Sequence, residues 1–227
     1  MFHAVAAMTP DEVASVRATI TAARVSTYDA SVPTGHEHTR RALALYVWNA
    51  EIASEFLVPL HLCEVAIRNA VSDAVSAQYG PRWPWVDGFV KSLPDPKKGY
   101  NPRRDVMTVR HKVATTGKVI PEVKFVFWQK MFTSRYDNAV WDHQLKYVLP
   151  GAQKGASVPE LRARVYADLD RIRLLRNRIA HHEPIIARDL RADLDAIADL
   201  VALRCPDTAK LLSTVERVSK LLPQRPQ

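Results

Sequence analysis

Apolar residues recur along this chain every three or four positions, which is the spacing of one face of an α-helix. Helix-starting signals precede two of these stretches. Thr9-Pro10-Asp11-Glu12 and Ser157-Val158-Pro159-Glu160 both have the spacing of a capping box, in which a hydroxyl side chain and a glutamate three residues later bond each other's backbone. The pattern predicts an all-α protein.

Two long helices are expected in the first half of the chain. One covers residues 38–56, and Pro59 breaks or kinks it. The next continues to Tyr79 and stops at Gly80-Pro81. The inward-facing positions expected in the first of these helices are Leu43, Tyr46, Val47, Ala50 and Ala53.

Residues 81–104 have a different composition, with several prolines and a cluster of basic residues, which predicts a mobile basic loop. Asn101-Pro102 is then expected to cap a short helix that carries Val113 and ends at Gly117. Residues 121–149 are rich in aromatic side chains at helical spacing, which favours a role in the core over a platform for stacking bases. The large apolar residues of this stretch are Phe125, Phe127, Trp128, Met131, Phe132, Tyr136 and Trp141.

The helix that opens at Ser157 has the clearest apolar stripe, because its apolar residues fall on one side at about 100° per residue. The members of the stripe are Leu161, Val165, Leu169, Ile172, Leu175 and Ile179. Two helices, over 188–204 and 207–222, are expected to close the chain. Their inward positions are Leu190, Leu194, Ile197 and Val201, then Leu211, Val215, Val218 and Leu222.

Composition agrees with a globular protein, since 47% of the 227 residues are hydrophobic and 25% are charged, and it suggests a single domain over residues 1–227. The formal charge of +8 favours a polyanionic partner such as RNA. Cys63 and Cys205 lie far apart in apolar contexts, which indicates buried thiols in a reducing compartment. Neither a signal peptide at Met1–Met8 nor a transmembrane run is expected, so the protein is predicted to be cytoplasmic, with no membrane partner.

Three polar residues stand out near the end of the Ser157 helix. Arg176 falls inside the arc of the apolar stripe, where a guanidinium is costly unless it is paired, hydrogen-bonded or facing a cleft. Asn177 and His181 lie four residues apart on a second face, and Pro184 ends the helix soon afterwards. An imidazole there suits proton transfer near neutral pH.

The segment from Leu175 to Pro184 resembles the Arg-Asn-x-x-x-His signature of HEPN domains, and the chain around it resembles the Abi-like abortive-infection subfamily. Residues 42–49, 62–70, 125–128 and 135–136 carry the wider similarity, which covers most of residues 40–220. The resemblance implies a HEPN-like helical bundle with its core over about 38–204 and additional helices. It also implies a homodimer that brings two signatures together, and RNA cleavage without a metal or other cofactor, in phage defence or as a toxin restrained by a cognate antitoxin.

On this hypothesis His181 transfers the proton of the RNA 2′-hydroxyl, Arg176 stabilises charge on the phosphorane, and Asn177 orients His181 or the phosphate. On an ideal helix Arg176 and His181 are separated by roughly 140° and about 7.5 Å of rise, so a cleft between two subunits is expected to complete the site. The alternative is structural: Arg176 anchors a buried carboxylate and His181 packs at the helix end. The carboxylates considered for that role are Glu64, Asp168 and Asp170.

Further residues are expected either to support the active centre or to bind RNA beside it. Glu64 and Arg68 are four residues apart and are expected to form a helix pair, either in a buried structural network or, with Asn69, beside the RNA site. His182 is another supporting candidate. The residues expected to bind RNA are Lys97, Lys98, Arg103, Arg104, Arg173 and Arg178, for which a solvated surface is the alternative.

No metal site is expected, because His36-x-His38 and His181-His182-Glu183 lack further ligands at a recognisable spacing. Two other classes of function stay open. One is a non-catalytic RNA-binding module of the same helical fold, and the other is a protein-interaction module in which Arg176 and His181 secure an interface.

Overall fold

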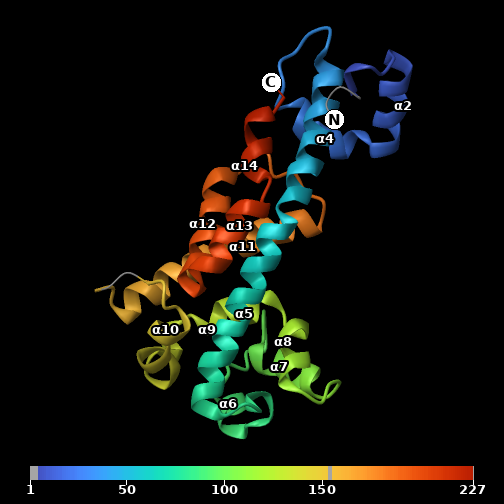
Figure 1. The fold of residues 1–227 in the computed structure, drawn as a ribbon. Helices are drawn as coiled ribbons and strands as arrows, with labels where there is room; N and C mark the ends of the chain where they lie inside the picture. Colours follow the sequence, from blue (N-terminus) through green and yellow to red (C-terminus); the bar gives the residue numbers. More distant parts are fainter. Residues whose placement is uncertain (1–4, 153–154, 227) are drawn as a thin grey trace. The chain divides into compact units, whose positions relative to one another are not determined.

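The computed structural model describes residues 5–152 and 155–226, and these residues form helices without a β-strand (Figure 1). The all-α prediction is therefore confirmed at the level of fold class. None of the described helices is both long enough and apolar enough to cross a membrane. Residues 1–4, on which part of the signal-peptide prediction depends, lie outside the described residues.

Contacts divide the chain into two compact units, whereas composition alone suggested a single domain over 1–227. Unit 1 comprises the described residues 5–58, 175–194 and 215–226. Unit 2 comprises the described residues 59–152, 155–174 and 195–214. Each unit is therefore assembled from segments that are distant in sequence.

Unit 1 is built on three helices that pack on one another, α2 (Pro10–Ile20), α3 (Ala22–Asp29) and α4 (His38–Glu55). The capping box predicted before α2 is present, with the Glu12 backbone N–H donating to Thr9 Oγ1 at 3.3 Å and the Thr9 N–H donating to Glu12 Oε2 at 2.6 Å. The short helix α14 (Val218–Leu221) also packs on α4. Trp48 of α4 is 1% exposed and donates from Nε1 to the Leu221 carbonyl at 3.1 Å.

The buried face of α4 differs from the predicted one. Among the expected inward positions only Leu43 is buried, and Leu45, Trp48 and Ile52 occupy the interior instead. These large side chains bury more apolar area than alanine does, so they determine which face turns inward. The other expected positions, Tyr46, Val47, Ala50 and Ala53, are half-buried or exposed.

The junction after α4 also lies upstream of the predicted one. Helix α4 ends at Glu55 and α5 (Leu57–Tyr79) begins two residues later, before Pro59. Pro59 lies in the first turn of α5, where its missing N–H removes no intrahelical hydrogen bond. The predicted end of this helix is confirmed, because α5 stops at Tyr79 and Gly80 follows with a φ of 84°.

Residues 81–104 contain regular structure instead of one loop. The helices η1 (Trp83–Trp85) and α6 (Asp87–Ser92) form there because Trp83, which is fully buried, anchors the segment. Asn101 caps α7 (Pro102–Arg110) as predicted, but α7 ends at Arg110, so Val113 lies beyond it and Gly117 falls inside α8 (Thr116–Glu122).

The aromatic-rich stretch forms core, as predicted. All seven of its large apolar residues are buried, and the rings of Phe132 and Trp141 stack with centroids 4.6 Å apart. The elements that carry the stretch are α9 (Phe125–Met131), η2 (Ser134–Tyr136), the π-helix η3 (Asp137–Trp141) and α10 (Asp142–Val148).

Helix α11 (Val158–Ala180) confirms the capping box and the apolar stripe. Ser157 and Glu160 bond reciprocally, with the Glu160 N–H donating to Ser157 Oγ at 3.4 Å, and all six residues of the stripe are buried. The boundary between the units falls within this helix, after Leu174.

The closing helices agree with the prediction only in part. Helix α12 (Leu190–Arg204) buries the four expected positions, but the single helix over 207–222 is wrong. It is divided into α13 (Pro206–Val215) and α14, because the Glu216 carboxylate accepts the Ser219 N–H at 3.0 Å and starts a new turn. The register changes accordingly, and Leu211 and Val215 are exposed instead of buried.

The two cysteines are free thiols in different surroundings. Cys63 is fully buried, as predicted, and its burial raises the pKa of the thiol. Cys205 is only partly buried, because it lies at the start of α13, and hydrogen bonds from Thr208 lower the pKa of its thiol. The prediction of two buried thiols therefore holds for Cys63 alone.

Candidate functional site

The three residues of the predicted active centre all belong to unit 1, at the end of α11. Arg176 and Asn177 are half-buried, and His181 is exposed. The His181 backbone N–H donates to the Asn177 carbonyl at 3.0 Å, so His181 lies at the last hydrogen bond of the helix. His181 is thus open to solvent, one helical turn beyond half-buried Arg176 and Asn177.

The helix ends in a Schellman turn, with His182 at the position that glycine usually occupies. The His182 N–H donates to the Ile179 carbonyl at 3.1 Å, and the Glu183 N–H donates to the Arg178 carbonyl at 2.8 Å. His182 has a φ of 54°, a left-handed conformation that costs a side-chain-bearing residue roughly 1–2 kcal/mol. Strained backbone of this kind often accompanies functional residues, because only a rigid surrounding can maintain it.

Three hydrogen bonds fix the segment that follows the turn. Arg24 of α3 donates to the His182 carbonyl at 2.9 Å, and Arg178 donates to the Pro184 carbonyl at 2.7 Å. The Ile185 N–H donates to Oδ1 of Asn49, on α4, at 2.7 Å. The backbone that carries His181 is therefore held from three elements of unit 1.

Sequence reasoning missed Arg24 and Asn49 as supports of this turn. Asn49 is 6% exposed, and a buried amide on an apolar helix is a local signal that its oxygen has a specific donor. Arg24 gave no such signal, because it is exposed and its hydrogen bond joins residues 158 positions apart. Arg178, which the sequence predicted to bind RNA, donates to the Pro184 carbonyl and forms an ion pair with Glu183, with Nη1 3.8 Å from Glu183 Oε2.

A cavity of about 460 Å³ lies in unit 1 beside the Schellman turn. Tyr28 and Tyr46 form part of its wall, with ring centroids 5.3 Å apart and planes at 78°. Tyr28 is fully buried, and this burial raises the pKa of its hydroxyl to about 12. The remaining lining residues are Asn49, Ala50, Ala53, Ser54, Leu57, Ile179, Ala180, His182 and Glu183.

The predicted supporting residues Glu64, Arg68 and Asn69 belong to unit 2. Glu64 and Arg68 form the helix pair that their spacing predicted, with Arg68 Nη2 2.5 Å from Glu64 Oε2 and both side chains largely buried. Asn69 is exposed. The pair thus has the character of a structural network within unit 2.

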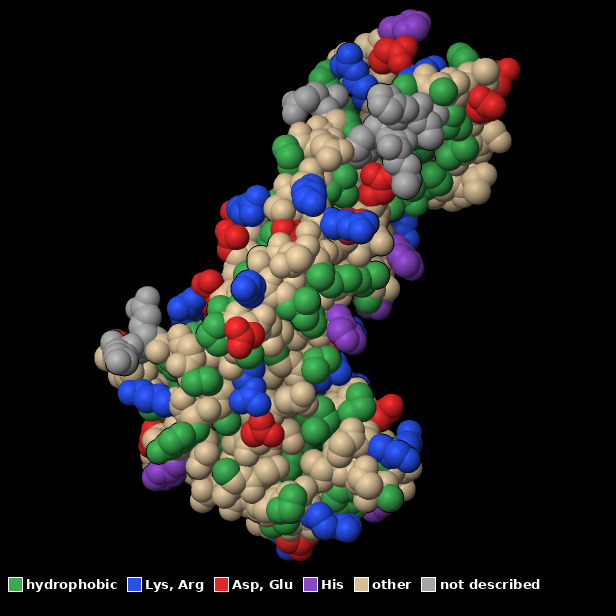
Figure 2. All heavy atoms as spheres, in the orientation of Figure 1, with side chains coloured by type: hydrophobic (Ala, Val, Ile, Leu, Met, Phe, Trp, Pro, Cys, Tyr) green, Lys and Arg blue, Asp and Glu red, His purple; other side chains and the backbone are tan. Residues whose placement is uncertain are grey.

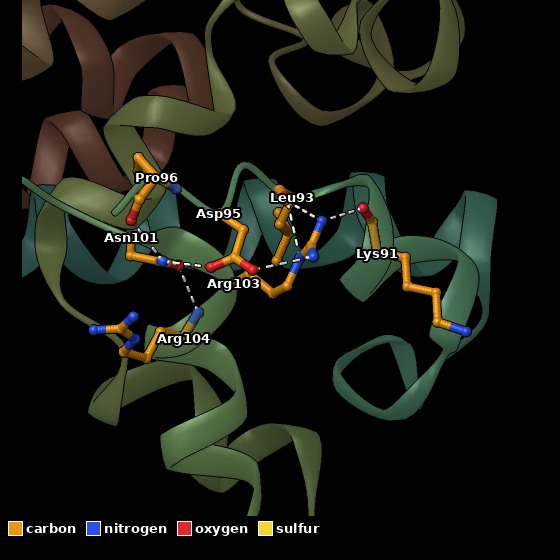
Figure 3. Close-up of polar contacts among 7 residues, drawn as sticks. All are labelled: Lys91, Leu93, Asp95, Pro96, Asn101, Arg103 and Arg104. Carbon is orange, nitrogen blue, oxygen red and sulfur yellow. Dashed lines mark hydrogen bonds and ion pairs between the residues drawn. The ribbon is translucent and has the colours of Figure 1, made fainter. Parts of the chain in front are cut away.

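The basic residues predicted to bind RNA in unit 2 divide into two kinds (Figure 3). Arg103 donates to the Leu93 carbonyl from Nε at 3.1 Å, to the Lys91 carbonyl from Nη2 at 2.6 Å, and to Asp95 Oδ2 from Nη1 at 3.3 Å. Arg104 contributes only its backbone N–H to this network, and its side chain points away. Arg103 therefore stabilises the fold, while the exposed side chains of Arg104, Lys97 and Lys98 can meet a phosphate.

Arg173 also has a structural environment. It donates from Nε to Gln129 Oε1 at 2.9 Å and from Nη2 to Asp170 Oδ1 at 2.7 Å. Gln129 is 1% exposed and donates in turn to the same oxygen of Asp170 at 2.8 Å. The hydrogen bond from Arg173 lowers the pKa of the Asp170 carboxyl, so this closed triangle links α9 to α11 within unit 2.

The positive charge of the chain is dispersed on the face that Figure 2 shows. Lys and Arg side chains alternate there with Asp and Glu side chains over the described residues, and they form no continuous basic stripe on that face. On that face, binding of a polyanion would depend on local groups of residues more than on the formal charge of +8.

Metal ligands do not gather in the part of the chain that the structure describes, where no group of three or more His, Cys, Asp or Glu side chains is placed to hold an ion.

No family model, curated protein or solved structure matches this chain. The likeness to HEPN domains thus depends on the sequence segments alone, and the observations that bear on function are those of the site.

Proposed function

We propose that the protein is an endoribonuclease of the HEPN type that cleaves RNA by attack of the 2′-hydroxyl on the adjacent phosphodiester. The observation that carries the proposal is the end of α11, where an exposed imidazole, His181, follows half-buried Arg176 and Asn177 on a turn fixed by three hydrogen bonds. Imidazole and guanidinium are the kinds of group that can transfer the protons and stabilise the charge in this reaction.

In the proposed reaction an imidazole accepts the proton of the 2′-hydroxyl, whose oxygen bonds to phosphorus while the bond from phosphorus to the 5′-oxygen breaks. A protonated imidazole gives its proton to the leaving 5′-oxygen, and the guanidinium of Arg176 offsets charge on the non-bridging oxygens. Asn177 orients the imidazole or the phosphate by hydrogen bonding. The products are a 2′,3′-cyclic phosphate and a 5′-hydroxyl, and no metal takes part.

The two proton transfers require two imidazoles in different protonation states, which a homodimer supplies as one His181 from each subunit. Exposed apolar side chains of unit 1 outside the cavity support self-association, since Val58 is 47% exposed and Val215 is 41% exposed. The dimer also removes the difficulty that Arg176 and His181 point in different directions from one helix.

The cellular role is proposed from the resemblance: a cytoplasmic toxin or phage-defence nuclease, held in check by a cognate antitoxin. Two features of the chain agree with a reducing compartment. Cys63 and Cys205 are both free thiols, and Cys63 is fully buried.

Cleavage of end-labelled single-stranded RNA in the presence of EDTA tests the proposal. The wild-type protein should yield 2′,3′-cyclic phosphate ends, and His181→Ala or Arg176→Ala should lower the rate at least 100-fold, the typical contribution of a proton-transfer or charge-stabilising group. Matched controls in unit 1 are His36→Ala and Arg41→Ala, which alter exposed residues outside the site and should cleave normally. Equal rates for His181→Ala and His36→Ala would exclude His181 from the chemistry.

A non-catalytic RNA-binding module is the second candidate, and the exposed cations of unit 2 favour it. Lys97, Lys98 and Arg104 can contact phosphates without any contribution from His181. RNA binding that depends on these residues, together with intact RNA after prolonged incubation with the wild-type protein, would select this function over the nuclease.

A further inference from the structure

We propose that the cavity of unit 1 binds one guanine base of the RNA and so directs the protein to guanosine. The inference rests on the proposed function in one respect, since it assumes that RNA is the ligand. The cavity has a volume of about 460 Å³, which falls within the range of small-ligand sites, about 300–1,000 Å³. Two of its lining residues, His182 and Glu183, directly follow the proposed proton-transfer residue His181.

The aromatic wall of the cavity suits a planar base. Tyr46 is half-buried and lines the cavity, and the fully buried Tyr28 lies against it with ring centroids 5.3 Å apart and planes at 78°. This edge-to-face contact holds Tyr46 in one orientation. Single-stranded RNA is commonly bound by stacking an unpaired base on such a ring, and the surrounding Ala50, Ala53 and Ile179 add apolar contact.

Two polar groups in the lining give the cavity its base preference. Glu183 is partly exposed and forms an ion pair with Arg178, its Oε2 lying 3.8 Å from Arg178 Nη1. This separation is longer than a hydrogen bond, so the carboxylate retains lone pairs for a ligand. Asn49 is 6% exposed and uses Oδ1 to accept the Ile185 N–H, which leaves the hydrogens of Nδ2 as the donors available to the cavity.

A carboxylate acceptor together with an amide donor matches guanine better than the other bases. Guanine presents two adjacent donors, N1–H and the N2 amino group, next to the acceptor O6. A carboxylate accepts both donors side by side, and an amide N–H can reach O6. Adenine presents a ring acceptor beside its single amino group, so it would place a lone pair against the Glu183 carboxylate.

The first experiment measures binding separately from cleavage. The His181→Ala protein is titrated with fluorescent uridine-rich oligonucleotides that contain one guanosine, inosine or adenosine at the centre. Guanosine should bind roughly tenfold or more tightly than adenosine. Inosine, which lacks the N2 amino group, should lose roughly tenfold relative to guanosine. Equal affinity for all three oligonucleotides would overturn the proposal.

Glu183→Gln in the same background provides the sharper readout. Removing a negative charge should strengthen RNA binding in general, whereas the preference for guanosine over adenosine should fall to about one because the amide cannot accept two donors side by side. A preference that persists in this variant would show that Glu183 does not read the base. Because the readout is a ratio of affinities, it does not depend on whether the wild-type protein cleaves RNA.

A steric variant tests the location of the base without altering the polar groups. Ala50 is exposed at the cavity wall on α4, so Ala50→Trp should fill the cavity and abolish the guanosine preference. Ala18→Trp, at an exposed position of α2 outside the cavity, is the matched control and should retain it. If Ala50→Trp changed only the oligomeric state and kept the preference, the cavity would be an interface between subunits and the proposal would fail.

Discussion

Two turns of this molecule are held by arginine side chains that donate to backbone carbonyls, one in each unit. In unit 2, Arg103 fixes residues 91–95 through the carbonyls of Lys91 and Leu93. In unit 1, Arg24 and Arg178 fix the turn after α11 through the carbonyls of His182 and Pro184. The first turn encloses its arginine in a network with Asp95 and Asn101, whereas the second presents the exposed imidazole of His181.

The comparison shows that a basic residue beside a candidate site can either hold the backbone in place or remain exposed for a ligand. Arg103, Arg173 and Arg178 belong to the basic groups that sequence predicted to bind RNA, yet each donates to an acceptor within its own unit. The exposed cations Lys97, Lys98 and Arg104 are the better candidates for phosphate contacts. In the proposed catalytic turn, the arginines Arg24 and Arg178 are structural, because they hold the backbone next to His181.

The largest expected effect concerns the enclosed turn. Arg103→Ala removes its hydrogen bonds to Leu93, Lys91 and Asp95 and should lower the free energy of unfolding in urea by about 2–3 kcal/mol. Arg24→Ala, which removes one exposed hydrogen bond, should cost only about 0.5–1 kcal/mol. Arg104→Ala should leave stability unchanged and weaken RNA binding. Equal losses for Arg103→Ala and Arg104→Ala would contradict the distinction between the two kinds of arginine.

The next effect concerns the buried amide that supports the proposed catalytic turn. Asn49→Ala leaves the Ile185 N–H without its acceptor and should cost about 2 kcal/mol in thermal or urea unfolding. RNA cleavage should fall further than the loss of folded protein explains, because the turn that carries His181 loses one of its three supports. Thr39→Ala, at an exposed position of the same helix outside the cavity, is the control and should change neither quantity.

A smaller effect tests the left-handed residue of the turn. His182→Val should cost about 1–2 kcal/mol, because a β-branched residue is strained at a φ of 54°. His182→Gly should be at least as stable as the wild type, since glycine adopts this conformation without strain. Unfolding curves of the two variants give the comparison. A Gly variant as unstable as the Val variant would mean that the histidine side chain, and not the backbone, maintains the turn.

The smallest effect is a pH dependence in unit 2. The hydrogen bond from Arg173 lowers the pKa of Asp170 below its ordinary value of 3.8. The stabilisation is therefore present above pH 3.8 and is lost as the pH falls through the lower folded-state value. The difference in unfolding free energy between the wild type and Arg173→Ala should shrink as the pH is lowered below 3.8, whereas Arg135→Ala, at an exposed arginine, should show no such trend.

Local patterns predicted what depends on neighbouring residues. The apolar stripe of α11, the capping boxes at Thr9 and Ser157 and the Glu64–Arg68 pair all follow from spacings of three or four residues, and the structure contains each of them. The placement of Arg176, Asn177 and His181 at one helix end follows from the same spacing. These features could be predicted from the sequence because the residues that interact lie within one or two helical turns of each other.

Features that depend on contacts between distant segments could not be predicted from the sequence. The inward face of α4 is set by what packs on Leu45, Trp48 and Ile52, and periodicity alone could not choose that face over the one with Tyr46. The hydrogen bond from Ile185 to Asn49 joins residues 136 positions apart. The division of the last predicted helix depends on the hydrogen bond from the Ser219 N–H to the Glu216 carboxylate. The spacing of hydrophobic residues does not predict such a bond.

Asn49 connects the proposed base-binding cavity with the proposed catalytic turn. Asn49 lines the cavity and its Oδ1 accepts the Ile185 N–H, so one side chain belongs both to the cavity wall and to the anchoring of the turn. If the proposed guanine occupied the cavity and displaced this amide, the Ile185 N–H bonded to it would have to move as well. Binding in the cavity would then be coupled to the position of the backbone that follows His182.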